Sequence, residues 1–141
     1  MTRPQTTPIG LQLTKTARSV SQAFERAMAD AGGSAAAWQV LLLVRSGQWD
    51  TQSGLAKAMG VTGATMTHHL NSLESQGLVR RWREESNRRV QQVELTDAGV
   101  ELFDRLRQVA MRHDARLRSG FSERELTQLS KLLSKLEDAA D

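Results

Sequence analysis

Arginine side chains crowd one short stretch of this chain. Five of the ten residues from Arg80 to Arg89 are arginine, and the polar run 84–87 divides them into two groups. Cations at this density repel one another unless phosphates or neighbouring carboxylates balance them. Alternating side chains at 78–83 and 90–95 predict two strands joined by that polar run. The pattern therefore predicts a basic hairpin whose chemistry is the binding of polyanions.

A predicted helix before this hairpin carries small and hydrogen-bonding side chains on one side. Thr62 offers a hydroxyl N-cap for a helix over 63–76. Apolar side chains recur at i, i+4 and i+7, which places them on one buried stripe: Met66, Leu70 and Leu73. The outer side can approach base edges in the major groove of DNA. The candidate DNA-contacting residues of this helix are Thr62, Ala64, Thr65, Thr67, His68 and Asn71.

The segment before that helix has the spacing of a helix-turn-helix. Ala56 is small enough for two helices to cross closely, and Gly60 can adopt the left-handed backbone of the turn. By itself this spacing also occurs by chance in small helical domains. With the hairpin and the following Leu95-Thr96 in register, it predicts a mainly α fold with a small β-wing, a winged helix-turn-helix that binds DNA.

The combined motifs resemble those of the MarR-type (multiple antibiotic resistance regulator) transcription factors. In that family the wing typically ends in Asp-Arg-Arg followed by Val-x-Leu-Thr, and this chain has Asn87-Arg88-Arg89 followed by Val93-Glu94-Leu95-Thr96. Three more segments carry the resemblance: 37–43, 55–62 and 73–81. The resemblance implies that Arg89 enters the minor groove and that the residue before the arginine pair holds it.

The chain departs from the family pattern at three positions. Asn87 replaces the wing aspartate, and an asparagine loses the charge-assisted carboxylate contact to a guanidinium. We therefore expect a looser wing in the free protein. His69 stands where an aliphatic residue is usual, and Gly63 stands where proline is common at the start of the helix. None of these changes removes the fold prediction.

Not every wing arginine is expected to contact DNA, because arginine clusters are often only solvated faces. On a strand, Arg81 and Arg83 lie on one side and Arg80 on the other. Only one or two of these three are expected to contact phosphate. The candidate DNA-contacting arginines of the wing are Arg81, Arg88 and Arg89.

The flanking segments predict helices that join two subunits. Apolar residues at helical spacing predict an amphipathic helix over 9–29, and Thr96 can cap another over 97–118. A capping box at Ser122 opens a last helix, whose apolar stripe is Leu126, Leu129, Leu132, Leu133 and Leu136. A compact DNA-binding core alone cannot bury that stripe, so a second subunit is expected to cover it.

The family resemblance implies the same two-fold dimer. We expect residues 1–141 to form a single domain, with 1–33 and 100–141 as dimerisation helices and 34–99 as the DNA-binding lobe. A symmetric dimer predicts a pseudo-palindromic site in double-stranded DNA, with half-sites about 34 Å apart.

The resemblance also implies a small, often aromatic anion bound between the dimerisation helices and the DNA-binding lobe. In such a pocket Trp38 would be an aromatic wall, His69 a polar group and Arg18 a charge partner. The alternative for Trp38 is plain core packing, since residues 38–44 are apolar enough to form the centre of the core. The expected role is a repressor released by this ligand.

Composition narrows the other classes. The chain has no cysteine, which excludes disulfides and thiolate metal sites, and no pair of histidines at helical zinc spacing, so no metal or cofactor is expected. Without an apolar run of membrane length or a signal peptide, a cytoplasmic protein without membrane association is expected. No nucleophile or phosphate-loop motif predicts an enzyme. The alternative to a ligand-responsive regulator is a constitutive DNA-organising or protein-docking module.

Overall fold

The computed structural model describes residues 6–141, and helices make up most of that part of the chain. The elements in order are α1 (Ile9–Asp30), α2 (Ala35–Arg45), α3 (Gln52–Met59), α4 (Gly63–Ser75), β1 (Val79–Glu84), β2 (Asn87–Leu95), α5 (Asp97–Arg118) and α6 (Glu123–Ala140). This confirms the predicted fold class, which is mainly α with a two-stranded wing.

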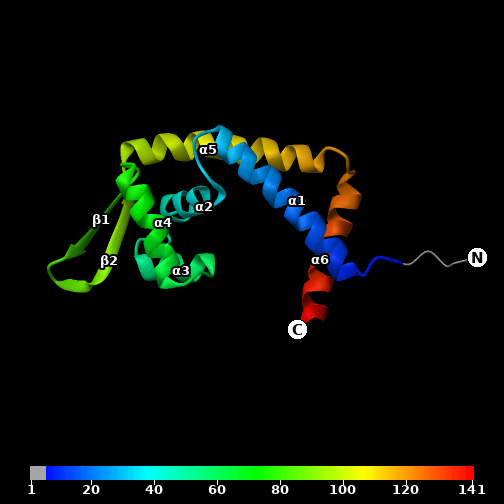
Figure 1. The fold of residues 1–141 in the computed structure, drawn as a ribbon, viewed down its shortest axis with the longest axis horizontal. Helices are drawn as coiled ribbons and strands as arrows, with labels where there is room; N and C mark the ends of the chain where they lie inside the picture. The colour runs from blue at the N-terminus through cyan, green and yellow to red at the C-terminus, as the bar shows by residue number, and fades with distance from the viewer. Residues whose placement is uncertain (1–5) are drawn as a thin grey trace, which may run out of the picture.

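The elements form a lobe and an extended helical arm. In Figure 1 the lobe consists of α2, α3, α4 and the two strands, gathered under one end of α5. Helix α5 leads away from the lobe, and α6 turns down from its far end. Helix α1 runs obliquely from α5 towards α6, so the start of α1 and the end of α6 lie far from the wing.

Side-chain caps fix where the helices begin. The hydroxyls of Ser34, Thr62 and Thr96 each accept a hydrogen bond from the backbone N–H three residues on, over 3.0, 3.1 and 3.0 Å. Ser122 and Glu125 form the predicted capping box. Gly60 ends α3 in the left-handed conformation, at φ 68°. All of these sequence predictions are therefore confirmed.

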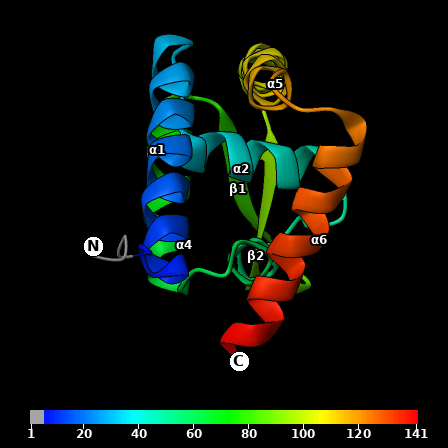
Figure 2. The same cartoon turned by 90° about the vertical axis from the view of Figure 1, so that its right-hand side faces the viewer.

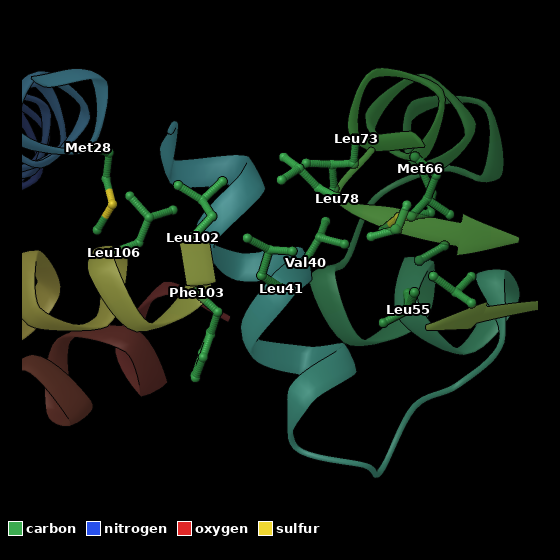
Figure 3. Close-up of a cluster of buried hydrophobic side chains, with 14 of the residues drawn as sticks. Met28, Val40, Leu41, Leu55, Met66, Leu73, Leu78, Leu102, Phe103 and Leu106 are labelled. Atoms are coloured by element: carbon green, nitrogen blue, oxygen red, sulfur yellow. The ribbon is translucent and has the colours of Figure 1, made fainter. Parts of the chain in front are cut away.

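The hydrophobic core joins the lobe to the arm. Figure 3 shows Met28 of α1 beside Leu106 of α5, with the α2 residues Val40 and Leu41 leading on to the lobe. These four side chains are fully buried. The prediction that 38–44 is buried on most sides is wrong for Leu42, whose exposed fraction is 41%. One side of α2 faces away from its neighbours, and Leu42 lies on that side.

The wing is longer than the sequence predicts on its returning strand. Strands β1 and β2 pair antiparallel from Val79 opposite Leu95 to Glu84 opposite Asn87, with an irregularity between Arg83 and Glu84. Strand β2 thus begins at Asn87 rather than at residue 90. The polar composition of 87–89 favours a turn, but backbone pairing across the hairpin overrides that local preference.

No single helix within residues 6–141 has both the length and the apolar character needed to cross a membrane. Helices α1 and α2 meet that criterion only as a pair, across a bend of 77°.

Gly99 is where the wing packs most closely on the arm. A Cβ at this position would overlap the backbone carbonyl oxygen of Leu78, which also accepts a hydrogen bond from the Thr96 N–H at 3.1 Å. Neither group can move without breaking the junction between β1 and α5. We expect Gly99→Ala to lower the free energy of unfolding by at least about 2 kcal/mol in urea denaturation.

Gly10→Ala is the matched control for this substitution. Gly10 lies in α1, and a Cβ there would meet no atom within 4 Å. The control should leave stability unchanged or raise it by roughly 0.5–1 kcal/mol, because alanine favours the helix. Equal stability of the two variants would show that the Gly99 junction is not tight.

Candidate nucleic-acid interface

Helix α4 presents a polar face to solvent and an apolar face to the core. Its three stripe residues are buried, with at most 3% of each side chain exposed: Met66, Leu70 and Leu73. Five of the six predicted contact residues of this helix and its cap are exposed: Thr62, Ala64, Thr65, His68 and Asn71. The stripe is therefore confirmed, and α4 has the form of a recognition helix with a free outer surface.

Thr67 differs from the other predicted contact residues because it is half-buried at the crossing of α3 and α4. Its hydroxyl oxygen accepts a hydrogen bond from the Gln52 amide at 2.6 Å and donates one to the Gly63 carbonyl at 3.0 Å. Both hydrogen-bonding capacities are thus occupied within the protein. Thr67 is placed to hold the two helices together, a support that the sequence analysis did not foresee for Gln52.

The arginine pair of β2 faces solvent. Arg88 and Arg89 are exposed, and no hydrogen bond or ion pair engages either side chain within the described part of the chain. Asn87 makes no bond to Arg89 there. The Arg88 backbone carbonyl does accept a hydrogen bond from Arg83 at 2.7 Å, which ties the two strands together near the tip. Two guanidinium groups are therefore available to an external anion.

Arg81 has a different environment from that pair. Its Nη2 atom donates to Asn71 Oδ1 at 2.5 Å and to Glu74 Oε1 at 3.0 Å, both on α4. Only 14% of its side chain is exposed. The hydrogen bond from Arg81 holds the pKa of the Glu74 carboxyl below its ordinary value. The predicted phosphate contact is thus internally paired, and so is the predicted base contact Asn71.

Sequence reasoning missed Glu74 as part of this site. Asn71 and Glu74 are three residues apart on α4, so they lie on the same face of the helix. The signal was present in that spacing, because an amide and a carboxylate side by side favour an arginine partner. What the sequence does not contain is the position of β1 relative to α4.

A family model described as the MarR family matches residues 34–90, from the cap of α2 into β2. The chain belongs to the MarR family. Proteins of this family are DNA-binding transcription regulators with a winged helix.

Solved structures of MarR-family regulators share the fold. The MepR–DNA complex from S. aureus is 21% identical, with a TM-score of 0.85, over 95% of this chain and 99% of that one. The transcriptional repressor CouR, bound to a 23-mer DNA duplex, is 27% identical, with a TM-score of 0.82, over 92% of each chain. PcaV from Streptomyces coelicolor, in complex with its natural ligand, is 19% identical, with a TM-score of 0.78, over 96% and 99%.

The three predicted ligand residues of this MarR-family chain do not converge. His69 lines a cavity of about 290 Å³ between the α1–α2 loop, α4 and α5. Trp38 instead stacks on Phe103, with ring centroids 5.5 Å apart and planes 11° apart, as the core-packing alternative requires. Arg18 is exposed on α1, before the part of that helix that packs on the core, and does not line this cavity.

Proposed function

We propose that this protein is a dimeric regulator that binds a specific DNA sequence, represses transcription and is released by a small aromatic ligand. The observation that supports DNA binding best is the exposed polar face of α4 beside the exposed Arg88 and Arg89. A helix of this kind fits the major groove, while the wing can reach the neighbouring minor groove. In this proposal the contacts come from Thr62, Ala64, Thr65, His68, Asn71, Arg88 and Arg89.

The apolar face of the arm supports the dimer. A groove between the start of α1 and α6 is lined by Ile9, Leu13, Leu129, Leu132, Leu133 and Leu136. Ile9 and Leu132 are 61% and 54% exposed, although both are large apolar residues. Figure 2 shows α1 and α6 on opposite sides of the view, so neither helix covers the other's apolar face over its length. A second copy, docked through 1–33 and 100–141, would remove this surface from water.

The proposed dimer determines the form of the DNA site. A two-fold axis places two copies of α4 on one face of the duplex, about one helical turn or 34 Å apart. The expected operator is therefore a pseudo-palindrome whose two halves each meet one α4 and one wing.

The cavity beside His69 supports the proposed ligand response. Its lining combines the polar residues His68, His69 and Gln76 of α4 and its end with Leu102 of α5. Its volume of about 290 Å³ suits a single aromatic ring with a polar substituent. Because the cavity borders α4, a ligand there would favour one placement of the lobe relative to the arm. DNA affinity would then fall by the ratio of ligand affinities for the two placements.

Fluorescence anisotropy with labelled duplex from upstream of the protein's own gene tests the ligand response. The complex is titrated with single-ring aromatic acids, and each compound is tested again on a His69→Phe variant. Release of wild-type protein by one acid, with at least tenfold weaker release of the variant, is the expected result. Specific binding that no acid alters would instead favour a constitutive DNA-organising protein.

Asn87→Asp tests the effect of the altered wing motif. A carboxylate before the arginine pair could accept a charge-assisted hydrogen bond from Arg89 and hold it in place. We expect DNA affinity to increase or stay unchanged, measured by the same anisotropy titration. A loss of more than about tenfold would show that the Asn87 amide itself contacts DNA.

A further inference from the structure

Arg81 differs from every other arginine of the wing in what its side chain contacts. Arg80 is 66% exposed and lies 3.5 Å from Glu94 on the same hairpin. Arg81 is 14% exposed and crosses from β1 to α4, where it binds two side chains. We infer that Arg81 is a positioning residue, which fixes the wing and the Asn71 amide relative to α4, and not a phosphate contact. This inference rests on the proposed DNA binding.

The charge of Arg81 is already compensated within the protein. The Glu74 carboxylate accepts its hydrogen bond at 3.0 Å, and the same contact lowers the pKa of Glu74, so the carboxylate stays ionised at neutral pH. A guanidinium paired in this way releases little counterion from DNA phosphate. The pair therefore connects two elements of the interface and adds little attraction for the duplex.

The contact also determines the orientation of the Asn71 amide. A guanidinium only donates hydrogen bonds, so the amide oxygen of Asn71 must face Arg81. The Nδ2 donors of this exposed side chain are left for the outer surface of α4. A bidentate contact to adenine needs both the oxygen and the nitrogen facing the base. Asn71 is thereby set to donate to an acceptor, such as guanine O6 or N7, or thymine O4.

Arg81→Met tests the inference, because methionine keeps much of the apolar stem and removes the donors. The experiment measures anisotropy on the upstream duplex and on a shuffled duplex across a salt series. We expect the ratio of the two affinities to fall at least tenfold, while the slope of log affinity against log salt changes by less than about half a unit. A lost phosphate contact would lower that slope by about 0.9 and weaken both duplexes alike.

Two further variants strengthen the test. Glu74→Gln removes the carboxylate that holds Arg81, so the affinity ratio should fall as it does for Arg81→Met. A phosphate-binding Arg81, freed from Glu74, would instead bind both duplexes more tightly. Arg118→Met is the matched control, since Arg118 is also ion-paired, to Asp114 at 2.7 Å, but lies at the end of α5. It should leave the ratio unchanged.

A measurement without DNA separates this inference from the proposed function. NMR titration of the Glu74 side chain should give a pKa below that of an ordinary glutamate in wild type and a higher value in Arg81→Met. Equal pKa values would overturn the contact itself. Equal binding of wild type to both duplexes would overturn the proposed function, whereas a specific wild type with an unchanged ratio in Arg81→Met would overturn the positioning role.

Discussion

Arg89→Ala should weaken binding to the upstream duplex by about 10- to 100-fold, the range for a single arginine contact with a groove. Arg89 is exposed, and no bond within residues 6–141 engages its side chain, so its loss removes nothing that holds the protein together. The dimer mass and the thermal unfolding midpoint should therefore stay as in wild type. Anisotropy, sedimentation and circular dichroism measure the three quantities on the same preparation.

The comparison with Arg118→Ala shows whether the effect is local to the wing. Both substitutions remove one positive charge, but Arg118 lies at the end of α5. If the two variants bind DNA equally well, net charge and not wing contact governs affinity, and the minor-groove assignment of Arg89 is wrong. A large loss confined to Arg89→Ala supports the assignment.

Leu132→Glu should convert the dimer into monomers. Leu132 lies at the middle of the apolar face of α6, between Leu129 and Leu133, and is 54% exposed in one chain. A two-fold axis applies the substitution twice, and each copy loses roughly 2 kcal/mol of apolar burial before the cost of burying a carboxylate. The dimer dissociation constant should rise by about 1,000-fold or more, which sedimentation equilibrium can measure.

Ser130→Glu is the matched control, because it adds the same charge to the same helix outside the leucine groove. This variant should remain dimeric. Monomeric Leu132→Glu should also bind the upstream duplex much more weakly, because only one α4 can then engage. A Leu132→Glu protein that stays dimeric would remove the α6 face from the subunit interface.

Local features of the fold could be predicted from the sequence. The hydroxyl caps at Thr62 and Thr96, and the left-handed Gly60, depend on neighbours three or four residues away. Buried stripes such as that of Met66 and Leu70 follow from helical periodicity alone. These features are determined within single elements, so their residue spacing was sufficient.

The contacts between elements could not be predicted in the same way. The Arg81 contact with Asn71 and Glu74 depends on how the β1 strand lies against α4, and no local pattern encodes that placement. Arg81 was predicted to face phosphate because it lies within an arginine-rich strand. Its internal pairing shows that composition predicts the charge of a surface better than the partner of each residue.

The proposed ligand site failed as a set for a related reason. Its residues were chosen from three helices, and only His69 lines the cavity beside α4. The large aromatic ring of Trp38 is stabilised by stacking on Phe103 within the core. A pocket depends on the side chains that leave space unfilled, which periodicity within one helix cannot show.

The central claim is that this MarR-family chain recognises a specific DNA sequence through α4 and the wing. The most direct test is anisotropy of the wild-type protein on the upstream duplex and on a shuffled duplex of equal length, from low to physiological salt. The account predicts an affinity ratio of about 1,000 or more that persists at physiological salt. Equal affinities that fall together with a steep salt slope would contradict it and show a protein that binds DNA by charge alone.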